Sequence, residues 1–137
     1  MDALLVNKSV LLFMLLTMFV TSQMIGGVEA SFHLETRVTM TNKLSEQLTL
    51  NCQDKNHNDG VHTLQPGESH RFKFLSDFFR SRSLWFCRFN WNGADHNFDI
   101  YIQKRDSCHD YECFWEINKE GPCLIDQVLK EKKCYQW

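Results

Sequence analysis

Residues Leu84–Trp91 read LWFCRFNW and are followed at once by the pair Asn92 and Gly93. Every second side chain of the run is an aromatic residue or a cysteine: Trp85, Cys87, Phe89 and Trp91. Because successive side chains of a strand point to opposite faces, this alternation predicts a strand with one buried face. An Asn-Gly pair after such a run favours a two-residue hairpin turn, since both residues readily adopt positive φ. Residues Phe98–Ile102 continue the alternation and are expected to form the returning strand.

Short runs of the same kind recur about every ten residues along the chain. They are Leu48–Gln53, Val61–Leu64, Arg71–Phe74, Cys113–Ile117 and Cys123–Ile125. Turn-forming residues separate them at Asn56–Gly60, Gln65–Glu68 and Lys119–Pro122. Only Ile125–Lys133 has a spacing that favours a polar helical stretch near the end. The pattern therefore predicts an all-β fold, a small antiparallel β-sandwich of about seven to nine strands stapled by disulfides.

The chain has 137 residues, 43% of them hydrophobic, which fits a single globular domain. Its 15 Lys and Arg against 17 Asp and Glu give a net charge of −2. Because a nucleic-acid-binding domain normally carries a basic excess, we expect no nucleic-acid partner. The sequence contains no internal repeat or low-complexity segment.

The N-terminus has the pattern of a secretory signal peptide. Met1 and Lys8 supply positive charge ahead of the apolar run Val10–Val20, which is shorter than the 18 to 20 or so residues that cross a membrane. Val28 and Ala30 fit the small-residue cleavage rule, so residues 1–30 are expected to be a signal peptide and residues 31–137 the mature domain. That domain would carry 14 basic and 15 acidic residues and would be extracellular, without stable membrane insertion.

All six cysteines lie in the expected mature domain, and an even number in a small secreted domain indicates three disulfides. Sequence alone allows about fifteen pairings. Because Cys87 and Cys113 lie centrally in two runs that can face one core, we expect the pairs Cys87–Cys113, Cys52–Cys123 and Cys108–Cys134.

Several motifs in order resemble the plant self-incompatibility S1 family, also called S-protein homologues. They are Gly60–Glu68, Trp85–Trp91, Phe98–Tyr101, Arg105 and Asp106, Cys113–Ile117 and Gly121–Cys123. The resemblance covers about residues 37 to 126 and implies a secreted, disulfide-stapled β-sandwich without enzymatic activity. The best-understood members are pistil proteins that act as ligands for a transmembrane protein on pollen, so it also implies signalling. Cys108 and Cys134 go beyond the four cysteines expected for the family core.

We therefore expect a monomeric extracellular polypeptide that binds a plasma-membrane receptor protein through loops, with no cofactor and no metal. The polar segments that interrupt the strand pattern are the candidate contact loops. They are Asp54–Asp59, Ser76–Ser83, Gly93–Asn97 and Ser107–Glu112. Within them we single out Asn56, Asn58, Asp59, Asp95, His96, His109 and Asp110.

Other chemistries have weaker sequence support. The six histidines lack the sequence contexts of pistil ribonucleases, and Cys108–Cys113 matches secreted phospholipases A2 over a few residues only. A zinc site of Cys108, His109 and Cys113 is disfavoured because an oxidising compartment favours disulfides. Two further classes stay open: a carbohydrate or cell-wall module using Trp85, Trp91, Trp115 and Trp137, and a defence protein using a basic patch of Arg71, Lys73, Arg80, Arg82 and Arg88. For Trp85 and Trp115, core packing is the favoured interpretation.

Overall fold

A computed structural model describes residues 2–25, 33–77 and 83–137. The chain divides into two compact units, Met1–Ser31 and Phe32–Trp137. The first contains the helix α1 (Asp2–Ile25), and no helix within the described ranges is both long and apolar enough to span a membrane. The second unit, called the β-domain below, contains the buried hydrophobic core and all three disulfides.

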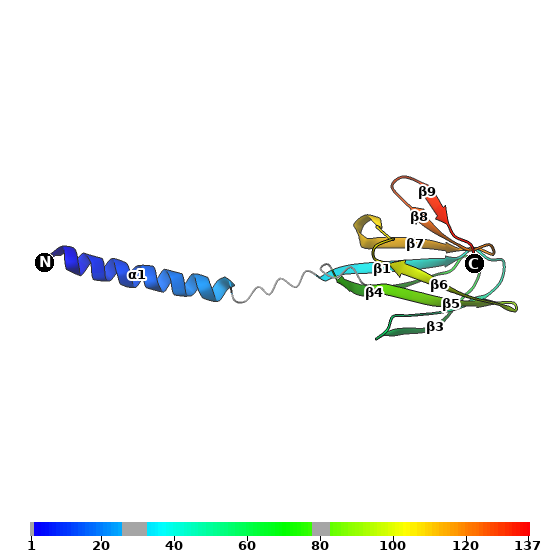
Figure 1. The fold of residues 1–137 in the computed structure, drawn as a ribbon, viewed down its shortest axis with the longest axis horizontal. Helices are drawn as coiled ribbons and strands as arrows, with labels where there is room; N and C mark the ends of the chain where they lie inside the picture. Colours follow the sequence, from blue (N-terminus) through cyan, green and yellow to red (C-terminus); the bar gives the residue numbers. More distant parts are fainter. Residues whose placement is uncertain (1, 26–32, 78–82) are drawn as a thin grey trace. The chain divides into compact units, whose positions relative to one another are not determined.

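The β-domain consists of two sheets (Figure 1). The first has the strand order β4-β1-β7-β8-β9, and the second has the order β3-β2-β5-β6. In chain order the strands are β1 (His33–Asn42), β2 (Leu48–Gln53), β3 (Asn58–Leu64), β4 (Ser69–Asp77), β5 (Leu84–Trp91), β6 (Ala94–Ile102), β7 (Glu112–Ile117), β8 (Pro122–Asp126) and β9 (Glu131–Cys134). A single turn, η1 (His109–Tyr111), with non-helical backbone at Asp110, precedes β7.

The inner faces of the two sheets form one core. On β5 the four alternating side chains singled out from the sequence are all buried, and Leu48, Leu50 and Cys52 of β2 face the same space. Trp115 of β7 is 1% exposed. Its ring packs in an edge-to-face arrangement against the ring of Phe98, which belongs to the other sheet. The predicted all-β sandwich is confirmed. The alternating apolar residues identify the face of each strand that is buried against the other sheet on folding.

The turn between β5 and β6 shows why local sequence predicts a hairpin. Asn92 has φ 35° and Gly93 has φ 83°. Both values are positive, as a type I′ turn requires, and such a turn matches the right-handed twist of the strands that it joins.

Two features of the sheets differ from the prediction. The sheets are not purely antiparallel, because β1 pairs with β7 in parallel, with Val38 opposite Cys113. The helical stretch expected over Ile125–Lys133 is wrong: β8 ends at Asp126, the chain turns, and β9 returns beside β8. In the antiparallel ladder, the backbone N–H and C=O groups of β8 and β9 bond to each other, whereas a short exposed helix would leave its terminal N–H and C=O groups bonded only to water.

All three predicted disulfide pairings are wrong. The bonds are Cys52–Cys87, Cys108–Cys113 and Cys123–Cys134. Cys52 lies opposite Cys87 in the β2–β5 register and Cys123 lies opposite Cys134 in the β8–β9 register, each pair with Cα atoms 4.0 Å apart. Cys87 and Cys113 both face the core, but they belong to different sheets, and packed sheets are separated by about 10 Å. A disulfide bridges Cα atoms no more than about 7 Å apart, so Cys52 and Cys123 each bond to the cysteine opposite them in their own sheet. Cys113 of β7 bonds instead to Cys108, which precedes it by five residues.

Candidate ligand-binding groove

A groove of about 540 Å³ lies between the segment before β7 and the turn that joins β8 to β9. Its apolar lining includes Phe114 and Ile125, which are opposite each other in the β7–β8 register. Both are half-buried, and both point away from the core because the buried Trp115 alternates with Phe114. Val128 of the turn is 59% exposed and extends this apolar surface. Apolar surface in a concave site is typical of a place where a ligand side chain is bound.

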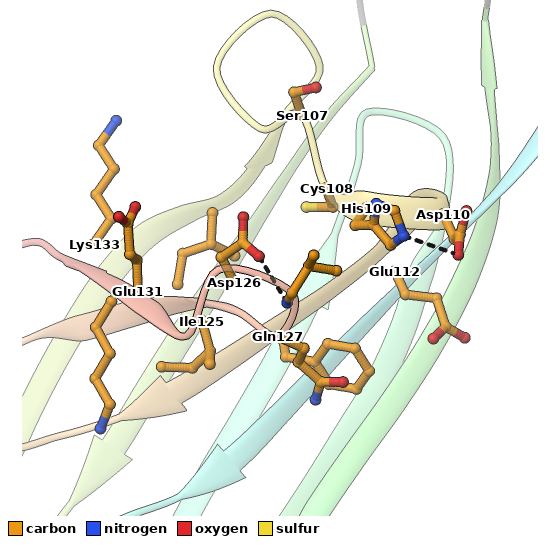
Figure 2. A pocket seen from close by; sticks show the side chains of 14 residues that line it. Ser107, Cys108, His109, Asp110, Glu112, Ile125, Asp126, Gln127, Glu131 and Lys133 are labelled. Atoms are coloured by element: carbon orange, nitrogen blue, oxygen red, sulfur yellow. Dashed lines mark hydrogen bonds and ion pairs between the residues drawn. The ribbon is translucent and has the colours of Figure 1, made fainter.

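Charged side chains surround this apolar lining. Figure 2 shows His109 and Asp110 on one side of the groove and Glu131 and Lys133 on the other. The titratable lining residues are His109, Asp110, Glu112, Asp126, Glu131, Lys132 and Lys133. Lys132 is already paired with Glu116 at 3.0 Å, and Glu112 with Arg37 at 3.2 Å. The charged residues around the apolar lining are called the rim below. Asp110 and Glu131 give this rim a negative charge, which the positive charge of Lys133 offsets in part.

The segment on one side of the groove is constrained by the Cys108–Cys113 disulfide. Within this small ring Asp110 has φ 52° and Tyr111 has φ 58°. The left-handed region is unfavourable for residues other than glycine, and two such residues in succession persist only where the surroundings impose them. The ring therefore holds His109, Asp110 and Tyr111 on the surface, where all three are exposed.

A buried ion pair fixes the chain just before this ring. The carboxylate of Asp106 accepts hydrogen bonds from Arg105 Nε at 2.7 Å and from the backbone N–H of Ile102 at 2.8 Å. The Arg105 guanidinium lies against the rings of Phe98 and Trp115, 5.3 and 5.7 Å from their centroids. Burial lowers the pKa of Arg105, but the hydrogen bonds and charge of Asp106 outweigh burial, and the net pKa is raised. The Arg-Asp motif therefore has a structural role here.

The opposite side of the groove is a turn that sequence reasoning missed. Asp126 Oδ1 accepts the backbone N–H groups of Val128 and Leu129, both at 2.9 Å, and Lys130 adopts φ 57°. An aspartate that caps a turn in this way is a recognisable signal, but the residues after it have good helix propensity. Val128 and Leu129 are left exposed on the turn.

The structure places the predicted contact residues in three separate regions. His109 and Asp110 line the groove, with His109 Nε2 at 3.3 Å from Asp110 Oδ2. Asn56 lies in the turn before β3, whereas Asn58 and Asp59 belong to β3 itself. Asp95 and His96 lie in β6, so the seven residues do not form one surface. The first candidate loop, Asp54–Asp59, is also shorter than expected, because its last two residues belong to a strand.

The candidate loop Gly93–Asn97 is also mostly strand, since β6 begins at Ala94. Asp95 pairs with Arg88 across the hairpin, which lowers the pKa of Asp95 and raises that of Arg88. His96 stacks on Trp137 with ring centroids 4.7 Å apart. Of the candidate loop Ser76–Ser83, Ser76 is buried in β4 and residues 78–82 lie outside the described residues.

The residues proposed for the two other classes take different positions. Trp85, Trp91 and Trp115 are buried, as core packing predicts for Trp85 and Trp115, and Trp137 packs on Phe89 at the edge of the core. These three buried rings are not available to stack on a sugar at the surface, whereas Trp137 is half-buried. Arg71 and Lys73 lie on β4 in one sheet and Arg88 lies on β5 in the other, while Arg80 and Arg82 lie outside the described residues. Arg71, Lys73 and Arg88, the described members of the expected basic patch, therefore do not lie together on one surface.

Comparison with known proteins identifies the family. The family model described as plant self-incompatibility protein S1 matches residues 37–137. S-protein homolog 2 of Arabidopsis thaliana is 43% identical over 108 residues, covering 73% of this chain and 66% of that relative, just under two thirds of its length. S-protein homolog 29 of the same plant is 38% identical over 106 residues, covering 75% of this chain and 78% of the relative.

A solved structure supports the fold. It is described as a self-incompatibility protein homologue, from a widespread family of small, highly stable, secreted plant proteins. It matches with a TM-score of 0.56 at 18% identity, covering 77% of this chain and 94% of that one, so the likeness concerns the fold. With the family model matched over most of the β-domain, the chain belongs to the plant self-incompatibility S1 family.

Proposed function

We propose that this protein is a secreted polypeptide ligand that binds a plasma-membrane receptor protein of plant cells through the groove between the Cys108–Cys113 ring and the β8–β9 turn. In this proposal residues 1–30 are a signal peptide removed after Ala30, and the β-domain acts as a monomer without enzymatic activity. The description of the solved relative as secreted supports the extracellular location. A mass measurement of the protein exported from plant cells tests the cleavage site.

The observation that carries the proposal is the combination of apolar lining and acidic rim in one constrained groove. Protein interfaces typically have a core of apolar contacts surrounded by polar groups. The ring holds His109 and Asp110 in a fixed backbone conformation, so little conformational entropy is lost when they bind. We expect the receptor to insert an apolar side chain beside Val128 and to place a basic group near Asp110 or Glu131.

Binding of the labelled, oxidised β-domain to intact plant cells tests this function, with intracellular calcium recorded in the same cells. We expect saturable, protease-sensitive binding followed by a rise in calcium. Val128→Asp should weaken binding about tenfold or more, equivalent to about 1.4 kcal/mol, because it places a charge at the apolar contact. Val61→Asp is the matched control, since Val61 is a similarly exposed valine that does not line the groove.

Other results of the binding experiment would argue against receptor binding through the groove. Equal binding of both valine variants and the wild type would exclude the groove as the contact surface. Binding that resists protease but is competed by wall polysaccharide would replace the receptor proposal with cell-wall binding. Leakage of anionic vesicles would instead favour a defence protein.

A further inference from the structure

A second cluster of polar side chains lies where β3, an edge strand of one sheet, contacts β4, an edge strand of the other (Figure 1). His62 lies opposite Leu50 in the β2–β3 register, and His70 lies opposite Met40 in the β1–β4 register. Residues opposite each other share a face of the sheet, and both Leu50 and Met40 are fully buried. The two imidazoles therefore point inward from different sheets, and they stack with ring centroids 3.6 Å apart.

A β-bulge brings a carboxylate to the same place. Cys52 of β2 lies opposite two residues of β3, Asp59 and Gly60, and Gly60 adopts φ +88°. An extra residue of this kind redirects the side chains on its strand. As a result, Asp59 Oδ2 lies 2.6 Å from His70 Nε2 and 3.2 Å from His62 Nε2.

We propose that Asp59, His62 and His70 form a binding site for a divalent transition-metal ion of the zinc class. Their ligand atoms all lie within 4.8 Å of one another. Zinc binds nitrogen and oxygen at about 2.0–2.2 Å, so neighbouring ligand atoms of a tetrahedral site lie about 3.4 Å apart. Small side-chain movements therefore fit the three donors around one ion. The ion would take the place of the contact between His70 Nε2 and the Asp59 carboxylate and of the contact, 2.9 Å long, between His62 Nε2 and the Asp59 backbone carbonyl.

The composition and exposure of the cluster select the kind of ion. Two imidazole nitrogens favour zinc, copper or nickel over calcium and magnesium, which prefer oxygen ligands. The three side chains are 17% to 34% exposed, so an ion can enter from solvent and keep a water in its fourth position. Arg71, a nearby cation on β4, donates to Thr39 Oγ1 at 3.0 Å. The bound ion would join the edges of the two sheets, a role separate from receptor binding.

Titration of the chelator-treated, oxidised β-domain with zinc chloride tests the site. The core and the disulfides lie within this unit, so it is suited to measurement on its own. We expect one zinc ion per chain and a higher midpoint of thermal unfolding, because an ion that binds only the folded state stabilises it. Cobalt chloride in place of zinc should give the intense visible absorption of a tetrahedral site.

Substitutions locate the ligands. His62→Gln, His70→Gln and Asp59→Asn should each weaken zinc binding by about tenfold or more. His109→Gln is the control and should bind as the wild type does, since His109 is an exposed histidine next to Asp110 that lies outside the cluster. If a ligand variant fails to fold, nuclear magnetic resonance of the wild-type imidazole nitrogens gives the same answer, because zinc should shift Nε2 of His62 and His70. Absence of binding at millimolar zinc, or an equal loss in His109→Gln, would overturn the proposal.

Discussion

Replacing Asp106 by alanine should destabilise the β-domain more than any surface charge substitution. The carboxylate is 1% exposed and accepts the backbone N–H of Ile102 together with Nε and an Nη of Arg105. Removing one partner of a buried ion pair costs about 3–5 kcal/mol, because it leaves the other charge without compensation. Arg105 retains its bond to the Asp99 carbonyl and is 21% exposed, so we expect the lower end, about 3 kcal/mol.

Urea unfolding of the oxidised β-domain measures this change in the free energy of unfolding. For a domain of this size, about 3 kcal/mol corresponds to a fall of about 12–24 °C in Tm. Asp95→Ala is the control, because the Arg88–Asp95 pair is exposed and such pairs contribute little. Replacing both members of the buried pair by apolar residues, Arg105→Met with Asp106→Leu, should recover part of the loss. A loss below about 1 kcal/mol for Asp106→Ala would refute the reasoning, since it would place the pair in the range of surface ion pairs.

Three further predictions concern polar groups and disulfides. Asn42→Ala should lower the free energy of unfolding by about 2–3 kcal/mol in the same urea assay, because the buried Asn42 side chain bonds three backbone groups, two in the turn between β1 and β2 and one at the end of β3. Burial by itself raises the pKa of Asp54, but hydrogen bonds from two backbone N–H groups of the following turn, together with the hydrogen bond and charge of the His57 side chain, outweigh burial and hold the pKa below its ordinary value of 3.8. The stabilisation by Asp54 is therefore complete above that value and lost as pH falls through the folded-state pKa, so the stability difference between wild type and Asp54→Asn should shrink from about pH 5 to 2. Removing both Cys108 and Cys113 should leave the circular dichroism of the sheets unchanged but weaken cell binding, and unchanged binding would show that the ring does not order the contact residues.

The buried faces of the strands were predictable because they depend on neighbours in the sequence. Alternation in Leu84–Trp91 and Leu48–Gln53 identified side chains that the structure buries. The positive φ of Asn92 and Gly93 likewise follows from residue type. His109 and Asp110 were singled out as polar residues of a strand interruption, and they do line the groove.

The groove itself could not be predicted, since its other side comes from a segment whose local pattern favours a helix. Asp126 caps a turn there, and β9 is held by pairing with β8 and by the Cys123–Cys134 bond. Helix propensity is a weak preference that such tertiary contacts override.

The sequence by itself determined the all-β class, the inward-facing side chains of the central strands and the family resemblance, because these depend on residue types and their spacing along the chain. Only the tertiary structure decided which cysteines bond, that β1 runs parallel to β7, and that His62 and His70 meet across the two sheets. Disulfide partners and ligand clusters depend on which strands become neighbours and in which register. Those choices are made by the packing of the whole core, which no single run of residues encodes.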